Sequence, residues 1–387
     1  MRHAWWVFLK ELRDALRDRR TLRAVLLSAV LPGPLMLGLI SMQVDDMERH
    51  VESRELVVQG IDHAPSLRNF AERQGWTLRD APADFQAALR ANRQGEPVLQ
   101  VPEGFEAAMA RGEMPRLTLV GDSANSRASQ SQRRVQDLVQ GWLRERATLE
   151  LVLRGVSPAV LQPATLDTQD LADPAARGAT LMSMLPFMVL MAVVSGALGA
   201  ALDSTAGERE RGSLEPLLMN PASRGALVAG KWAAVALVGM AIAVLSCLSF
   251  LPGQWLLRSD QLAAMFRFGW QEAGAFVLLL LPLAGLLAAA MMAIAIRCRS
   301  VKEAQASATF LVLAVSLLPV VSMLNQTGEK PWQLWLPVVA QSTLMTRVLK
   351  AEAITAWDIA LPALVCAGLT AAVLTWVARQ LGRVVAR

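Results

Sequence analysis

Long uncharged apolar runs alternate with shorter charged segments along most of the chain. Six runs lack Asp, Glu, Lys and Arg, and at about 1.5 Å of helical rise per residue each can cross roughly 30 Å of hydrocarbon. The runs are residues 24–42, 179–202, 232–257, 273–296, 304–327 and 359–378. Because lipid offers the backbone no hydrogen-bond partners, each run is expected to be a helix. The pattern predicts a polytopic α-helical membrane protein with six transmembrane helices.

The segment between the first two runs, residues 43–178, has the pattern of a water-soluble domain. Short apolar stretches that end near Gly or Pro predict strands at 56–58, 98–101 and 117–120. Helical spacing of apolar residues predicts helices at 66–74, 85–90 and 129–154. This alternation predicts an α/β domain inserted between transmembrane helices 1 and 2.

Residues 1–23 precede the first run and are amphipathic. Apolar side chains recur there at helical spacing with charged residues between them: Trp5, Phe8, Leu9, Leu12 and Leu16. We expect a helix that lies in the membrane interface, the alternative being a solvated helix beside the membrane. Residues 179–387 then hold transmembrane helices 2–6.

The net charge of +5 is unevenly distributed along the chain. If the N-terminus is cytoplasmic, Lys and Arg on the inner side far outnumber those in the short outer loops, as the positive-inside rule requires. Both termini are therefore expected in the cytoplasm, and residues 43–178 outside it. The positive charge then faces anionic membrane lipids, and no nucleic-acid partner is expected.

Candidate catalytic chemistry is sparse. Cys247, Cys298 and Cys366 lie in or beside apolar runs, where a thiol acts as a small hydrophobe, and no set of residues has metal-ligand spacing. The string 225–231 matches the first seven positions of a phosphate-binding loop. Trp232 follows where a Ser or Thr must bind Mg²⁺, so the chain is not expected to be an ATPase or another enzyme.

Residues 203–224, between the second and third runs, combine charge with a short apolar patch. We expect a loop that inserts its apolar side chains into a cytoplasmic partner, the alternative being a plain connection. The candidate contact residues are Glu208, Arg209, Glu210, Arg211, Gly212, Leu214, Glu215, Leu217, Leu218, Pro221 and Arg224.

The string 208–218, followed by Asn-Pro-Ala-Ser-Arg at 220–224, resembles the coupling-loop signature of ABC-2-type transporter permeases. Residues 337–352 also resemble the outer segment before the family's last span, although Ala351 stands where relatives often carry Gly. The length and layout are most similar to the NatB-like branch, the permeases of sodium-extruding ABC exporters.

The resemblance implies a permease that works with a separate ABC ATP-binding subunit, present in two copies, which holds ATP and Mg²⁺. It also implies a homodimer of this chain in a bacterial inner membrane, with Na⁺ efflux as the expected activity. Export of drugs, lipids or peptides by the same architecture remains open. A function of another class, a membrane sensor or scaffold that transports nothing, also remains open.

A substrate path has only neutral polar candidates within the runs. They are Ser183, Ser195, Gln305, Thr309, Ser316 and Asn325. Their oxygen atoms suit Na⁺, although each one alone is better explained by a hydrogen bond between helices. The small residues at 195–201 predict a close helix contact, at a dimer interface or along the path.

Overall fold

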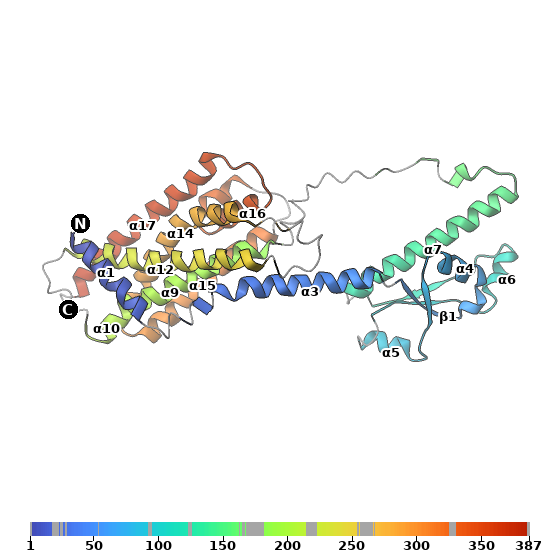
Figure 1. The fold of residues 1–387 in the computed structure, drawn as a ribbon, viewed down its shortest axis with the longest axis horizontal. Helices are drawn as coiled ribbons and strands as arrows, with labels where there is room; N and C mark the ends of the chain where they lie inside the picture. Colours follow the sequence, from blue (N-terminus) through green and yellow to red (C-terminus); the bar gives the residue numbers. More distant parts are fainter. Residues whose placement is uncertain are drawn as a thin grey trace. The chain divides into compact units, whose positions relative to one another are not determined.

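The computed structural model (Figure 1) describes residues 2–17, 23, 26–27, 29–52, 54–91, 95–122, 126–161, 163–164, 167, 182–213, 223–253, 255, 266, 268–324 and 330–384. The chain forms two compact units. One contains residues 1–45 and 171–387, and the other contains residues 46–170. The helix α3 (Pro32–Glu52) begins in the first unit and ends in the second.

The first unit is a bundle of helices. Its elements are α1 (Arg2–Arg17), α9 (Met184–Leu202), the π turn η3 (Asp203–Gly207), α10 (Glu208–Glu210), α12 (Arg224–Gly253), α14 (Trp270–Ala295), α15 (Val301–Leu324), the 3-10 helix η5 (Pro331–Trp335), α16 (Val339–Leu349) and α17 (Ala356–Val384). Five helices among the described residues are long and apolar enough to cross a membrane: Met184–Glu210, Arg224–Gly253, Trp270–Ala295, Val301–Val320 and Ala356–Leu381.

These five helices overlap the last five predicted runs. The run at 24–42 lies partly outside the described residues, and its described part contains the shorter apolar helix Pro32–Met42. A sixth transmembrane helix therefore stays a prediction. The helices also extend beyond the uncharged runs, so that Glu208 and Lys231 lie within candidate spans rather than outside them.

The bundle packs around α9, α12 and α14. At least 56% of the apolar window of each of these helices is buried, against 22% for α15 and α17, which lie at the periphery. A side chain on Gly196 of α9 would meet the Cα of Gly239 on α12 at 3.1 Å. The close contact predicted for the small residues of α9 is therefore made with α12 of the same chain.

The second unit is built on a four-stranded sheet of order β2-β1-β3-β4. The strand β1 (Glu55–Gln59) pairs in parallel with β2 (Thr77–Asp80) and β3 (Val98–Gln100), and β4 (Thr118–Val120) is antiparallel to β3. The remaining elements are η1 (Ile61–His63), α4 (Pro65–Arg73), α5 (Phe85–Arg90), α6 (Phe105–Ala110), α7 (Ser126–Leu153) and η2 (Pro158–Leu161).

Alternating side chains of the strands build two cores, one on each face of the sheet. Leu56 and Val58 of β1 pack in one core with residues of α4, α6 and α7. Val57, between them, packs in the other with Phe85 and Leu89 of α5. The three predicted strands and three predicted helices of this segment are confirmed within a few residues. The strand β2 and the helix α6 were not predicted.

One end of the bundle gathers charged segments of distant sequence. In Figure 1, α1, α10 and the last turns of α17 lie together at this end, and α16 lies toward the other. The predicted N-terminal helix is confirmed as α1, which packs on α12 and leaves Trp5 and Trp6 mostly exposed.

Candidate functional site

The prediction of a loop at residues 203–224 is wrong for residues 203–210, because these residues continue helix α9. Asp203–Gly207 form a π turn and Glu208–Glu210 a further helical turn. Ser204 and Thr205 in the π turn and Glu208 directly after it are buried. A π turn changes the backbone register and often occurs at functional sites. The charged residues pair with other helices, so they do not end the helix as solvated loop residues would.

Glu208 belongs to a buried network of opposite charges with Lys231 of α12 and Glu11 of α1. The Lys231 Nζ donates to Glu208 Oε2 at 2.6 Å, to Glu11 Oε1 at 2.7 Å and to the Ser204 carbonyl at 2.7 Å. The exposed fractions are 4% for Lys231, 7% for Glu11 and 5% for Glu208. Three segments that are far apart in sequence are thereby tied to one ammonium group.

Lys10 completes the network at its solvent side. Its Nζ lies 3.1 Å from Glu11 Oε1 and also pairs with Glu208. Two cations thus meet two carboxylates, which satisfies the requirement that buried charges be paired. Partial burial acts to lower the pKa of Lys10, but the hydrogen bond and charge of Glu208, together with Glu11, hold the pKa above its ordinary value. Lys10 therefore stays charged at neutral pH.

The contact between α1 and α12 depends on Gly230. A Cβ at this position would lie 2.6 Å from the Ala4 carbonyl oxygen and 2.8 Å from the Val7 Cβ, so only Gly lets α1 approach this closely. The string that resembles a phosphate-binding loop, residues 225–231, forms the first two turns of α12. Its Gly and Lys serve helix packing and the ion pair at these positions.

Arg209 and Glu210 reach two further helices. The Arg209 Nη1 donates to the Cys298 carbonyl at 3.2 Å and the Ile296 carbonyl at 3.4 Å, just beyond the C-terminus of α14. Glu210 Oε2 accepts from the Val301 amide, at the N-terminus of α15, at 2.8 Å. A cation at a helix C-terminus and an anion at an N-terminus both match the helix dipole.

Three consecutive residues thus contact different helices, because successive side chains on a helix point about 100° apart. Glu208 is bound to α12 and α1, Arg209 to α14, and Glu210 to α15. A displacement of this single turn would therefore act on four helices at once, α1, α12, α14 and α15. The geometry suits a mechanical connection between these helices.

The other predicted contact residues divide into two groups. Arg211 and Gly212 are exposed just after α10, where Arg211 Nη2 donates to the Asp203 carbonyl at 3.3 Å, and Arg224 is the exposed first residue of α12. The apolar patch and its neighbours lie outside the described residues: Leu214, Glu215, Leu217, Leu218 and Pro221.

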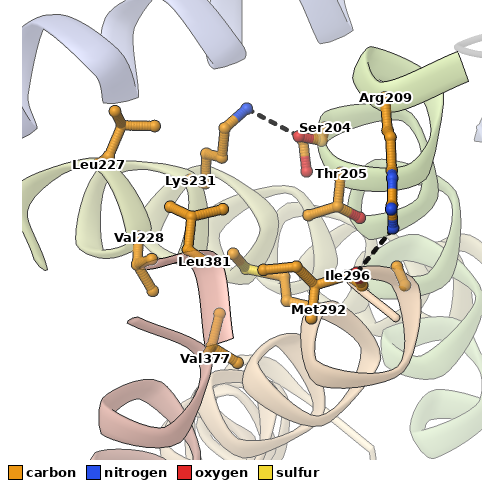
Figure 2. Close-up of a pocket in the computed structure, with 11 residues that line it drawn as sticks. Ser204, Thr205, Arg209, Leu227, Val228, Lys231, Met292, Ile296, Val377 and Leu381 are labelled. Carbon is orange, nitrogen blue, oxygen red and sulfur yellow. Dashed lines mark hydrogen bonds between the residues drawn. The ribbon is translucent and has the colours of Figure 1, made fainter. Parts of the chain in front are cut away.

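A small cavity lies beside the network (Figure 2). Its volume of about 20 Å³ offers room for roughly one water molecule. The lining side chains come from η3, α10, α12, α14 and α17: Ser204, Thr205, Arg209, Leu227, Val228, Lys231, Met292, Ala295, Ile296, Val377 and Leu381. Figure 2 shows Lys231 pointing toward Ser204 and Arg209 toward Ile296. The cavity lies where several helices meet, and it is too small for an organic ligand.

The predicted path residues are not brought around one cavity. Gln305 and Thr309 are exposed on α15, where the Thr309 hydroxyl donates to the Gln305 carbonyl at 2.9 Å. Ser195 is exposed on α9, and Ser183 is half-buried just before it. The half-buried Ser316 donates to the Leu313 carbonyl at 2.8 Å. Asn325 lies outside the described residues.

Lys231, Glu11 and Lys10 were not predicted as site residues. A usable signal was present, because Glu11 lies among the apolar residues of an amphipathic helix and Lys231 directly precedes an uncharged run. Single charges of opposite sign on apolar helix faces are expected to form ion pairs when those faces are buried. The likeness of the string 225–231 to a nucleotide-binding loop obscures this signal.

Two comparisons with known proteins bear on this arrangement. The family model described as ABC-2 family transporter protein matches residues 5–375. The chain is 30% identical over 331 residues to a protein of Bacillus subtilis (strain 168) described as ABC transporter permease protein NatB. This alignment covers 84% of the chain and 83% of the relative.

Proposed function

The chain belongs to the ABC-2 transporter family, and on that premise we propose that it is the permease of an ATP-driven Na⁺ exporter. Its apolar helices and its family make it a multi-pass membrane protein and the permease subunit of an ABC transporter. Na⁺ as cargo, outward direction and coupling through Glu208–Arg224 are the proposed parts. The observation that carries the coupling role is the set of contacts from one helical turn to α1, α12, α14 and α15.

The coupling role follows from the chemistry of that turn. ATP and Mg²⁺ would bind in a separate ATP-binding subunit, two copies of which would contact residues 211–224 from the cytoplasm. A push on this segment would reach Glu208, Arg209 and Glu210 directly through the backbone. Because their partners lie on different helices, the push would change the relative positions of those helices.

Na⁺ as cargo rests on the resemblance to the NatB-like branch and is supported by neutral oxygen atoms on the span surfaces. Ser195 on α9 and Gln305 and Thr309 on α15 are exposed on two helices that contact each other. Polar side chains on spans usually face protein or water. A second copy of the chain packed against this face would cover them and form the path between two subunits.

The coupling role is tested by Arg209→Gln in the complex with its ATP-binding subunit. The matched control is Arg299→Gln, which removes the same charge from an exposed side chain between α14 and α15. Loss of a charge-assisted hydrogen bond corresponds to about tenfold in a rate or equilibrium. We expect ATP-driven ²²Na⁺ accumulation in inside-out vesicles to fall about tenfold for Arg209→Gln and to stay within about twofold for Arg299→Gln.

The outcomes separate the parts of the proposal. Equal transport by the two variants would remove the coupling role of Arg209. ATP hydrolysis without any ²²Na⁺ accumulation by the wild-type complex would remove Na⁺ as cargo and leave export of drugs, lipids or peptides. Purification of the permease without any ATP-binding subunit would favour a membrane sensor or scaffold instead.

A further inference from the structure

A second cavity lies at the other end of the bundle from the coupling site, between η5, α16 and the start of α17. Its volume is about 260 Å³. It is lined by Lys330, Pro331, Gln333, Leu334, Thr343, Arg347 and Asp358. We call it the α16 pocket. None of its residues belongs to the charged network, so it needs an explanation of its own.

The charge of the α16 pocket favours an anion. Lys330 and Arg347 supply two cations against the single carboxylate of Asp358. The Asp358 Oδ2 lies 3.5 Å from the Arg347 Nη1, and it also accepts from the Thr355 amide at 3.0 Å and the Thr355 hydroxyl at 2.8 Å. Asp358 thus holds the Arg347 side chain while being itself satisfied at the start of α17.

The wall of the pocket also contains an unused polar group. Thr343 is 5% exposed, and its Oγ1 has no hydrogen-bond partner in the structure. A buried hydroxyl without a partner costs free energy unless a ligand or water satisfies it. An anion with several oxygen atoms can accept from the Thr343 hydroxyl, the Arg347 guanidinium and the Lys330 ammonium together.

The walls are held in place before any ligand arrives. Gln341 of α16 is 1% exposed, its Oε1 accepts from the Val338 amide at 2.8 Å, and its Nε2 lies 3.6 Å from the Cys366 Sγ of α17. Gln333 is 3% exposed, and its Oε1 accepts from the Lys330 amide at 3.2 Å. Fixed walls lower the entropy cost of binding.

The surroundings of the pocket place it at a membrane surface. Trp332 and Trp335 of η5 are 48% and 62% exposed, and Trp357 at the start of α17 is 64% exposed. Exposed Trp side chains at the ends of spans lie at the level of the lipid headgroups. The anionic group at that level in a bilayer is the phosphoryl group of the phospholipids, which Arg binds with two parallel hydrogen bonds.

We propose that the α16 pocket binds a phosphoryl group carried by a phospholipid headgroup. Bound there, the lipid ties η5, α16 and α17 together at one surface of the bilayer. The site is independent of the transported cargo and of the ATP-binding subunit.

The test compares retained lipid on the purified full-length chain by native mass spectrometry. The chain is incubated in detergent with dioleoyl-phosphatidylglycerol or dioleoyl-phosphatidylethanolamine, and separately with inorganic phosphate. The variants are Arg347→Gln and Lys330→Gln, and the control is Lys350→Gln, which removes a cation that pairs with Glu352 and does not line the pocket.

We expect one phospholipid per chain, an affinity about tenfold weaker for either pocket variant, and an affinity within about twofold of wild type for Lys350→Gln. Lys330 is exposed, so Lys330→Gln tests the site even if Arg347→Gln unfolds the protein. If millimolar inorganic phosphate does not displace the bound lipid, the phosphoryl group comes from a lipid headgroup. If the chain binds inorganic phosphate and retains no lipid, the proposal of a headgroup ligand is overturned and the ligand is free phosphate. Retention that is the same in all three variants overturns the proposal.

Discussion

At the scale of single residues, Lys231 is the group that joins the charged segments at one end of the bundle. Its ammonium group joins α12 to Glu11 of α1 and to Glu208 of the helical turn. Taking charges out of water costs several kcal/mol for each ion, so such a network adds little net stability. The network instead determines how α1, α12 and the turn at Glu208 are aligned with one another, because this arrangement pairs their buried charges.

Replacement of Lys231 by Met should therefore be strongly destabilising. The variant keeps the length of the side chain but leaves Glu11 and Glu208 with Lys10 as their only described cation. Removing one partner of a buried pair costs about 3 kcal/mol. The free energy of unfolding, measured by SDS titration with Trp fluorescence, should fall by about that amount.

Lys302→Met is the control, since Lys302 is exposed near the start of α15. Surface substitutions usually change stability by less than about 0.5 kcal/mol. Equal losses in Lys231→Met and Lys302→Met would show that the ion pairs do not contribute to folding. A loss in Lys231→Met that Glu11→Gln partly reverses would identify the unpaired carboxylate as the cause.

Ala351 supports a second prediction at this scale. It follows α16 with φ +56°, a left-handed conformation that costs a residue with a Cβ about 1 kcal/mol. The amide of Glu352 donates to the Arg347 carbonyl at 3.0 Å, which closes the turn at the end of the helix. The backbone at this position therefore favours Gly over Ala.

Ala351→Gly should accordingly raise the free energy of unfolding by about 1 kcal/mol. Ala353→Gly, two residues on in an exposed loop without positive φ, should give no gain, because Gly there only adds freedom to the unfolded chain. The same SDS titration measures both variants. A gain in Ala353→Gly equal to that in Ala351→Gly would contradict the role of the left-handed backbone.

At the scale of elements, the helix α1 acts as a part of the bundle rather than as a free membrane anchor. It buries Glu11 against α12 and keeps Trp5, Trp6 and Leu16 exposed. The face that carries these apolar side chains is therefore free for the lipid interface, while the opposite face is fixed by Gly230 and Lys231.

Gly230→Ala should displace α1. The added Cβ would meet backbone and Cβ atoms of α1 within 3 Å, and these cannot rotate away as a flexible side chain would. We expect the free energy of unfolding to fall by about 1–3 kcal/mol. Gly225→Ala, in the same helix with no atom within 4 Å of the added Cβ, should be neutral or slightly stabilising.

A distance measurement separates displacement of α1 from general instability. Spin labels are attached at His3→Cys of α1 and Arg224→Cys of α12, two exposed positions, while the native thiols are buried and should take up little label. The distance between the labels, measured by pulsed electron paramagnetic resonance, should shift or broaden in Gly230→Ala and stay constant in Lys302→Met. An unchanged distance in Gly230→Ala would show that α1 adapts without moving.

The elements that the sequence predicted are those whose pattern is local. Uncharged runs identified five helices, and apolar triplets such as Leu56–Val58 identified strands. The strand β2 reads Thr-Leu-Arg-Asp and is mostly exposed, so its pairing with β1 leaves little trace in hydrophobicity. It is a strand because it pairs with β1 at the edge of the sheet, and this pairing depends on tertiary structure rather than on the local sequence.

The candidate site was predicted in one half only. Glu208, Arg209 and Glu210 were found because they lie together in a charged string. Their helical conformation was missed, since Asp203 and the charges after it usually end an apolar helix. Their partners are spread over the chain, at Glu11, Lys231, Cys298 and Val301. The local pattern marks Glu11 and Lys231 as charges on apolar helix faces that need partners, but it does not show which distant groups those partners are.

At the scale of the whole molecule, the distribution of charge predicts how the chain sits in the membrane. If residues 211–224 contact a cytoplasmic subunit, as we propose, the candidate span Met184–Glu210 that precedes them predicts residues 46–170 on the other side of the bilayer. The positive-inside rule makes the same assignment from Lys and Arg alone. Two independent arguments, one mechanical and one electrostatic, thus predict one topology.

Cysteine labelling in intact cells tests this topology. The native Cys247, Cys298 and Cys366 are at most 4% exposed, so a membrane-impermeant maleimide should react slowly with the unmodified chain. Met114→Cys introduces a thiol at a position that is 95% exposed in the second unit. Ser213→Cys introduces one at an exposed position directly after α10.

We expect the maleimide to label Met114→Cys in intact cells and to label Ser213→Cys only after the membrane is permeabilised. The unmodified chain, treated in both ways, measures the background from the buried thiols. Labelling of Ser213→Cys without permeabilisation would place the charged turn on the face of the membrane that has no ATP. The contacts of Glu208, Arg209 and Glu210 would then still hold the bundle together, but they would have no cytoplasmic subunit to receive a push from.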